Sequence, residues 1–200
     1  MKRMSLPIAL ASKSPRRQQL LQEAGFNFRV VLPNVEEIYP KSLAPELVPA
    51  YLSSLKAHGA LGLIEPHETI LAADSIVILD HKIYEKPTNR ANAIEILETL
   101  SGNTHQVITG VTLLSSDKKE RTFSGLTQVT LETLTTEEIE FYVDNFNPYD
   151  KAGAYGIQEW IGHCKISKIH GSYLNVMGLP IDLVYKNLEA WLNNSTFGTI

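Results

Sequence analysis

The 200-residue sequence predicts an α/β protein with a mixed, elongated central sheet that is flanked by helices. Two observations lead to this expectation. Short apolar runs alternate with segments of helical period along most of the chain, as strands and helices do in α/β proteins. In addition, two long runs rich in Thr and Val, 104–116 and 121–133, are joined by four polar residues, which is typical of an antiparallel hairpin.

The composition excludes several classes of protein. With 44% apolar and 20% charged residues, the chain resembles an ordinary globular protein. Its net charge of −4 disfavours general binding to nucleic acid, although a local basic cluster would suit a small anion. No apolar run is long enough to span a membrane. The single cysteine, Cys164, allows no internal disulfide and is expected to be a buried thiol in a cytoplasmic protein.

The first strand and helix are predicted around a basic turn. Residues 6–11 form an apolar run, Ser14 and Pro15 are typical of a helix start, and Gly25 of a helix end. The free N–H groups of such a helix start attract anions. Hydroxyls and cations surround this turn: Ser12, Lys13, Arg16 and Arg17. The turn is therefore either a phosphate site or a solvated basic surface. It is not one of the glycine-rich nucleotide-binding loops.

The next elements alternate as expected for an α/β fold. Residues 28–32 alternate as a strand, and residues 46–61 repeat as an amphipathic helix, with Lys56 beside the apolar stripe. Residues 69–73 form a buried strand that is expected to end in Asp74-Ser75. An extended run then leads into a hairpin turn at Asp80-His81.

Two helices are predicted on either side of the long hairpin. The first is capped by Thr88 and buries one face, formed by Ala91, Ile94, Leu97 and Leu100. The second begins with a capping box, in which Thr135 caps the helix and Glu138 reaches back.

The C-terminal part is less regular. Residues 150–162 are rich in glycine and show no period, which indicates backbone that passes close to another group. A short strand is expected at 166–170, a turn at Gly171-Ser172, and a final helix that begins at Pro180.

Polar residues at strand ends are the candidates for a site, because open α/β sheets bind ligands there. Ser12 and Lys13, Glu37, Asp74, and Lys86 each follow a predicted strand. Two carboxylates with nearby Lys and Arg suit Mg²⁺-assisted phosphate chemistry. Each residue also has a simpler reading, as a turn residue, a solvated loop or the flank of a helix. The pattern alone predicts a phosphate-binding α/β enzyme and names no reaction.

Taken together, eight segments in this order resemble the Maf family of nucleotide pyrophosphatases over nearly the whole chain. The segments are Ala11-Ser12-Lys13-Ser14-Pro15-Arg16-Arg17, Val35-Glu36-Glu37, Leu55-Lys56-Ala57, Ala73-Asp74-Ser75-Ile76-Val77, Glu85-Lys86-Pro87, His105–Val111, Asp150–Gln158 and Gly171–Pro180.

The resemblance implies one domain over residues 1–200, with two lobes and a cleft as in inosine triphosphate pyrophosphatases. It implies hydrolysis of a nucleoside triphosphate between the α and β phosphates. The segment at 150–158 resembles the branch that acts on dTTP and UTP. A homodimer is also implied by the resemblance. The cysteine content, the net charge and the absence of a long apolar run add the expectation of a cytoplasmic protein with no nucleic-acid or membrane partner.

The resemblance also implies roles for single residues. Asp74 would be the proton acceptor and, with Glu37, would hold Mg²⁺ or Mn²⁺. Base preference would depend on Arg16, Ser75 and Gln158. The phosphates would be bound by Ser12, Ser14, Arg17, Lys56 and Lys86. The family more often has Thr where this chain has Ser75, so a modest change in fit is expected.

Two other functions are consistent with the same family. One is a pyrophosphatase that prefers 7-methyl-GTP. The other is a nucleotide-sensing regulator of cell division without enzymatic activity. The presence of both carboxylates and both lysines favours the enzyme.

Overall fold

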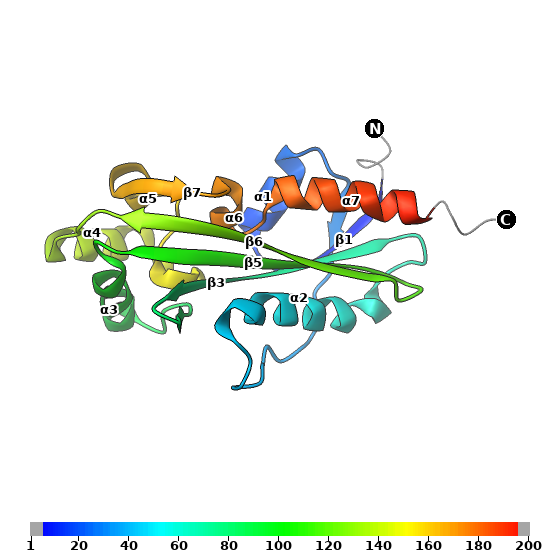
Figure 1. The fold of residues 1–200 in the computed structure, drawn as a ribbon, viewed down its shortest axis with the longest axis horizontal. Coiled ribbons are helices and arrows are strands. Elements are labelled where there is room, and N and C mark those ends of the chain that lie inside the picture. Colours follow the sequence, from blue (N-terminus) through cyan, green and yellow to red (C-terminus); the bar gives the residue numbers. More distant parts are fainter. Residues whose placement is uncertain (1–5, 196–200) are drawn as a thin grey trace.

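The computed structural model describes the backbone of residues 6–195 and the side chains of residues 6–192. Its centre is a seven-stranded sheet in the order β2-β1-β3-β5-β6-β7, with β4 paired to β3 (Figure 1). The strands are β1 (Ile8–Ala11), β2 (Phe28–Val30), β3 (Thr69–Leu79), β4 (Lys82–Tyr84), β5 (Thr104–Ser115), β6 (Glu120–Leu131) and β7 (Ile166–His170). Strand β1 is parallel to β2 and β3, and every other pair is antiparallel. The expected mixed sheet is confirmed.

Helices flank this sheet on both faces (Figure 1). The α-helices are α1 (Pro15–Glu23), α2 (Val48–Gly59), α3 (Arg90–Leu100), α4 (Thr136–Phe146), α5 (Trp160–Cys164), α6 (Tyr173–Met177) and α7 (Ile181–Ser195). The 3-10 turns are η2 (Pro45–Leu47), η3 (Leu61–Leu63), η4 (Pro148–Asp150) and η5 (Ala152–Ala154). No helix among residues 6–195 is both long and apolar enough to cross a membrane.

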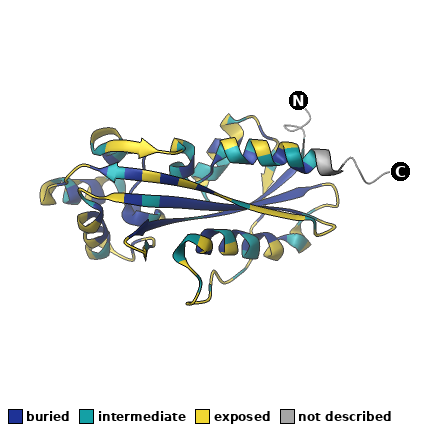
Figure 2. Ribbon diagram, viewed as in Figure 1, coloured by how far each residue is buried: buried dark blue, intermediate teal, exposed yellow. Residues whose placement is uncertain are grey.

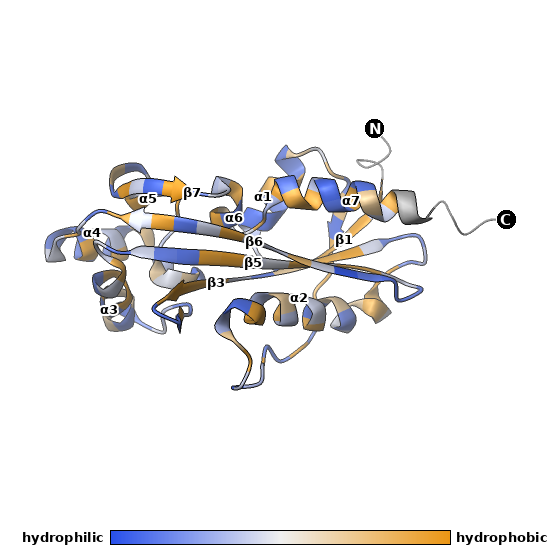
Figure 3. Ribbon diagram, viewed as in Figure 1, coloured by the Kyte–Doolittle hydropathy of each residue, from blue (hydrophilic) through white to orange (hydrophobic). Residues whose placement is uncertain are grey.

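The core is divided between the two ends of the long sheet. Helices α3 and α4 pack on one end, where Leu97 and Tyr142 are fully buried. Helices α1 and α7 pack on the other end, around Leu10 and Leu188. Strands β3 and β5 run through both ends and are buried along most of their length (Figure 2). Helix α7 alternates apolar and polar residues along its length, as a helix with one buried face does (Figure 3). Helix α2 also packs against the long strands, through Leu52 and Ala57. The long strands therefore connect three groups of helices.

Most of the expected elements are present, and one expected strand end is wrong. The long hairpin of β5 and β6 forms, and the capping box of Thr135 and Glu138 is complete. Asp80 and His81 form the turn between β3 and β4, both at positive φ. Strand β3, however, does not end at Asp74 but continues to Leu79. It continues because β5 pairs with it from Thr69 to Ile78 without interruption.

Other corrections concern caps and burial. Asn89, and not Thr88, caps α3, because its side chain accepts the N–H of Asn92. The buried face of α3 includes Ala93 and Ile96, while Ala91 is exposed. Cys164 is exposed, contrary to the expected buried thiol, since the five-residue α5 buries only Ile161.

Two short helices, α5 and α6, were not expected. The turn predicted at Gly171-Ser172 is followed directly by α6, and the Ser172 hydroxyl caps it by accepting the N–H of Asn175. Residues 173–177 make only five residues of helix, which is too short to show a helical period in the sequence.

Candidate active site

An interruption in strand pairing places Asp74 and Ser75 beside the basic turn. On one side of β3, the pairing with β1 ends at Ala72, and the pairing with β4 begins only at Val77. The edge of β3 between these two points faces the turn that leads from β1 into α1. Asp74 therefore lies at a strand end after all, but the strand that ends is the neighbouring β1.

A single cavity of about 430 Å³ opens at this point. It is lined by every residue for which a site role was predicted: Ser12, Ser14, Arg16, Arg17, Glu37, Lys56, Asp74, Ser75, Lys86 and Gln158. Lys13 also lines it. These residues come from segments that are far apart in the chain, so the fold brings the complete predicted set together.

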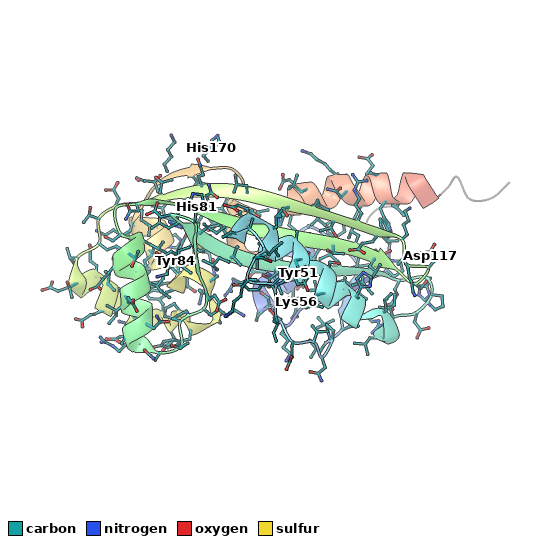
Figure 4. All side chains as sticks on the ribbon, turned by 60° about the horizontal axis from the view of Figure 1, so that its bottom comes forward. Tyr51, Lys56, His81, Tyr84, Asp117 and His170 are labelled. Carbon is teal, nitrogen blue, oxygen red and sulfur yellow. The ribbon has the colours of Figure 1, made fainter. Side chains whose placement is uncertain are left out.

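The lysine cluster, defined as Glu37, Lys56 and Asp74, forms one part of the wall. Lys56 comes from α2 (Figure 4), and its Nζ donates to Asp74 Oδ1 at 2.6 Å and contacts Glu37 Oε2 at 2.7 Å. Lys56 is 9% exposed and Asp74 8% exposed, so the alternative reading of Lys56 as a solvated helix flank is wrong. Both carboxylates lie within reach of one ammonium group, and the cluster carries one net negative charge.

This donor set fits a hard divalent cation that also binds substrate. Mg²⁺ is commonly held by one or two carboxylates together with phosphate oxygens and water. Within residues 6–192, no group of three or more His, Cys, Asp or Glu side chains could hold a metal ion by itself. Glu37 and Asp74 therefore fit a metal that is completed by phosphate, and they do not fit a closed structural site.

Arg17 forms hydrogen bonds with the unpaired edge of β3. It donates from Nη1 to the Ala73 carbonyl at 2.8 Å, from Nη2 to Ser75 Oγ at 3.0 Å, and from Nε to the Gly178 carbonyl at 2.9 Å. A fourth bond runs from Nη1 to Ser12 Oγ at 3.2 Å. Burial lowers the pKa of Arg17, while the charge of Asp74 acts in the opposite direction. The guanidinium thus satisfies a carbonyl that a neighbouring strand would otherwise bind.

The Ser75 hydroxyl is held from two sides. It accepts from Arg17 and shares a hydrogen bond of 2.8 Å with Thr109 Oγ1 on β5. Thr109 is fully buried and also donates to the Asn175 carbonyl at 3.2 Å. The position of this hydroxyl is therefore fixed by the sheet and by α1 together.

Ser12 and Ser14 organise the turn itself. The Ser14 N–H donates to Ser12 Oγ at 3.2 Å, and α1 begins one residue later at Pro15. Ser14 stands at the predicted cap position, but its side chain makes no cap hydrogen bond. The start of α1 is therefore left with N–H groups that suit an anion.

The arginine network, defined as Arg16, Asp150, Lys151 and Glu159, forms another part of the site. Arg16 Nη1 donates to Asp150 Oδ2 at 2.7 Å, and Lys151 Nζ contacts Asp150 Oδ1 at 2.7 Å and Glu159 Oε1 at 3.1 Å. Burial raises the pKa of Asp150, but the bonds from Lys151 and Arg16 outweigh it and hold the pKa below its ordinary value. Nearby, Gln158 Oε1 is buried and has no hydrogen-bond partner.

Sequence reasoning assigned no role to Asp150, Lys151 or Glu159. Asp150 and Lys151 stood in a segment that carried the family resemblance, and the high density of glycine there was the available signal. Their partners could not be read from the sequence, because Arg16 lies 134 residues before Asp150.

The fold and the cavity define an α/β protein with an anion-binding site at the interrupted edge of a mixed sheet. The chain belongs to the Maf family: the model of this family, described as Maf-like protein, matches residues 7–191. A protein of Cytophaga hutchinsonii named dTTP/UTP pyrophosphatase is 47% identical over 186 residues, which are 93% of this chain and 84% of that protein. A protein of Bacteroides thetaiotaomicron with the same name is 45% identical, over 91% of this chain and 94% of that protein.

Among solved structures, the Staphylococcus aureus Ham1 protein is similar with a TM-score of 0.47 and 16% sequence identity. That similarity covers 62% of this chain and 71% of the Ham1 chain.

Proposed function

We propose that this protein is a nucleoside triphosphate pyrophosphatase that hydrolyses dTTP and UTP to the monophosphate and pyrophosphate. The observation that supports the proposal best is that one cavity collects the whole predicted set of phosphate, base and metal residues. Two relatives that are 45% and 47% identical over nine-tenths of this chain carry the name dTTP/UTP pyrophosphatase.

In this proposal Asp74 is the general base. Its carboxylate is largely buried and is oriented by Lys56, so it can hold a water molecule in one direction and accept its proton. Glu37 and Asp74 would also hold the Mg²⁺ or Mn²⁺, which supplies charge to neutralise the phosphate oxygens. Lys56 keeps the two carboxylates together before substrate arrives.

The phosphates would lie against the basic turn. Ser12 and Ser14 offer hydroxyls next to the start of α1, and Lys56 and Lys86 offer ammonium groups from other segments. Arg17 adds a positive charge that four hydrogen bonds hold in place. Positioning and charge stabilisation of this kind are the main requirements of phosphate chemistry.

The base would be read by Arg16, Ser75 and Gln158. Gln158 has an unpartnered, buried Oε1 in the same cavity, and an unpartnered buried acceptor is costly unless a ligand uses it. A side-chain amide offers both a donor and an acceptor, which is what the edge of a pyrimidine requires.

A nucleotide panel tests the proposal. The protein is incubated with Mg²⁺ or Mn²⁺ and with dTTP, UTP, 7-methyl-GTP or dGTP, and the products are separated by ion exchange. We expect pyrophosphate and the monophosphate, with dTTP and UTP as the best substrates. Release of orthophosphate would contradict cleavage between the α and β phosphates, and a preference for 7-methyl-GTP would contradict the pyrimidine assignment.

We further propose that residues 1–200 form one domain and that the protein acts in the cytoplasm as a homodimer. The match of the family model from residue 7 to residue 191 supports the single domain. Sedimentation equilibrium of the full chain tests the dimer, and a monomer at all concentrations would contradict it.

A further inference from the structure

The contact between Arg16 and Asp150 joins two segments that are distant in the chain. Arg16 lies in the first turn of α1, and Asp150 is the last residue of η4. Beside the 2.7 Å bond between Nη1 and Oδ2, Arg16 Nη2 donates to the Asp150 carbonyl oxygen at 3.4 Å. Both residues line the cavity. Asp150 therefore restrains the guanidinium from two directions within the site.

The side chain of Asp150 is 55% exposed, but a chain of contacts links its carboxylate to the core. Lys151, which is only 8% exposed, binds its second oxygen and also binds Glu159. Glu159 in turn accepts a hydrogen bond from the hydroxyl of Tyr142, a fully buried residue of α4. The chain of contacts runs from the core of one sheet end to Arg16. An isolated surface ion pair has no such support, and its geometry is correspondingly loose.

The hydroxyl of Tyr142 also positions the segment that carries Gln158. The Tyr142 hydroxyl accepts the N–H of Gly156 at 2.9 Å as well as donating to Glu159, so it fixes the chain on both sides of Gln158. Arg16 and Gln158 line one cavity and are held by one network. Their relative placement follows from that network.

The two side chains differ in what they can distinguish. The side-chain amide of Gln158 can rotate by half a turn, so that it offers either a donor or an acceptor at the same position. Arginine has five N–H donors and no acceptor. Uracil and thymine have a carbonyl at position 4, whereas cytosine has an amino group there. An arginine fixed with a donor directed at position 4 therefore favours the carbonyl of uracil and thymine over the amino group of cytosine, whereas a glutamine whose amide can rotate binds either group.

We propose that Asp150 is a specificity-determining positioning residue: it fixes Arg16 so that the remaining donors of the guanidinium favour a 4-carbonyl over a 4-amino group. Asp150 acts through Arg16 and touches neither the reacting phosphates nor the metal. This inference rests on the proposed pyrophosphatase function. It adds the reason why the site would select uracil and thymine.

The test compares UTP with CTP. Their bases differ at position 4, a carbonyl against an amino group, and consequently at N3, which carries a hydrogen in uracil and is an acceptor in cytosine. The readout is the ratio of kcat/KM for UTP to kcat/KM for CTP, measured by pyrophosphate release. We expect Asp150→Asn to lower this ratio about tenfold, the size of one charge-assisted hydrogen bond. Because the reacting groups are untouched, kcat for UTP should stay within about twofold of the unmodified protein.

A double-variant comparison separates positioning from a direct role. In an Arg16→Gln background, Asp150→Asn should leave the ratio unchanged, since the group that Asp150 positions is gone. Asp144→Asn is the matched control. Asp144 binds Arg90 through both oxygens, at 2.6 and 2.9 Å, on the surface of α4 away from the cavity, and its variant should keep the original ratio.

Several results would overturn the inference. One is a ratio in Asp150→Asn within about twofold of the original. Another is a fall in kcat for UTP as large as the fall in kcat/KM, and a third is a further loss of selectivity in the double variant. A wild-type protein that releases no pyrophosphate from UTP would instead overturn the proposed function, so the two failures are distinguishable.

Discussion

The lysine cluster and the arginine network line the same cavity, yet they rest on different supports. Lys56 and Asp74 come from the regular elements α2 and β3, and both are largely buried. Asp150 and Lys151 come from short 3-10 turns and a loop, and they are held by contacts that lead to Tyr142 on α4. Regular secondary structure supports the first, and a chain of polar side chains supports the second.

The two clusters also differ in charge. The lysine cluster has two carboxylates for one cation, so one negative charge is left for a metal to neutralise. The arginine network has two carboxylates for two cations and is neutral. A neutral network does not require a further ion to balance its charge, but the guanidinium of Arg16 still has donors that the network does not use. We propose from this difference that the first cluster carries out the chemistry and that the second selects the base.

Replacing Asp74 is the strongest test of this division. We expect Asp74→Asn to lower kcat for dTTP by about 10³-fold, because general-base catalysis contributes on that order. The fold should persist, since Lys56 keeps Glu37 as a partner. Steady-state pyrophosphate release measures the loss, and circular dichroism monitors the fold.

Asp80→Asn is the control for the Asp74 variant. Asp80 is exposed in the turn that follows β3, at a positive φ that asparagine also tolerates. Its variant should keep normal turnover. If Asp74→Asn kept turnover near that of Asp80→Asn, the lysine cluster would not be the chemical part of the site.

Replacing Arg17 tests whether the edge of β3 depends on it. Arg17→Lys keeps the positive charge but loses the planar fork that serves four oxygens. We expect the free energy of unfolding in urea to fall by about 3 kcal/mol, because buried acceptors lose their donors. Arg90→Lys removes an exposed fork that binds Asp144 and should have little effect. Equal effects of the two variants would contradict the special role of Arg17.

We expect the buried His105 to make the stability of the fold sensitive to acid. Burial lowers the pKa of His105 to about 4, and its Nε2 shares a 2.7 Å hydrogen bond with the hydroxyl of Tyr155, which lines the cavity. The unfolded chain binds this proton near its ordinary pKa of about 6.5, so stability is present above that value and is lost as pH falls.

The expected loss from His105 is about 2 kcal/mol of unfolding free energy between about pH 6 and pH 4. Urea unfolding at several pH values measures it, and His105→Gln should show a shallower dependence. His81 has an exposed side chain, so His81→Gln should keep the original dependence. Parallel curves for all three proteins would show that His105 does not account for the acid sensitivity.

Local patterns predicted most of the fold, because hairpins and caps depend on neighbours in the chain. The long hairpin and the capping box at Thr135 are examples. The extent of β3 was misjudged because it depends on β5, which lies about 30 residues further on. The exposure of Cys164 was misjudged because a short helix buries few residues.

The site was predictable only in part for the same reason. Strand ends and a basic helix start identified Asp74 and the turn, although the strand that ends there is β1. The burial of Lys56 between two carboxylates follows from how α2 packs on the sheet, and periodicity placed it beside the buried stripe. The link between Arg16 and Asp150 spans the chain and has no local signal.

The smallest expected effect concerns Ser75, which follows Asp74 of the lysine cluster in the chain and is proposed to help select the base. Ser75→Thr keeps the hydroxyl that accepts from Arg17 and bonds to Thr109, and it adds one methyl group to the cavity wall. One methylene-sized change is worth about 1 kcal/mol in binding, so KM for dTTP should change by about fivefold or less with kcat unaltered. Ser75→Ala is the comparison, because it leaves a donor of Arg17 and the hydroxyl of Thr109 without their partner. If the alanine variant changed KM no more than the threonine variant, the hydroxyl of Ser75 would have no part in the site, and the boundary between the two clusters would lie elsewhere in the cavity.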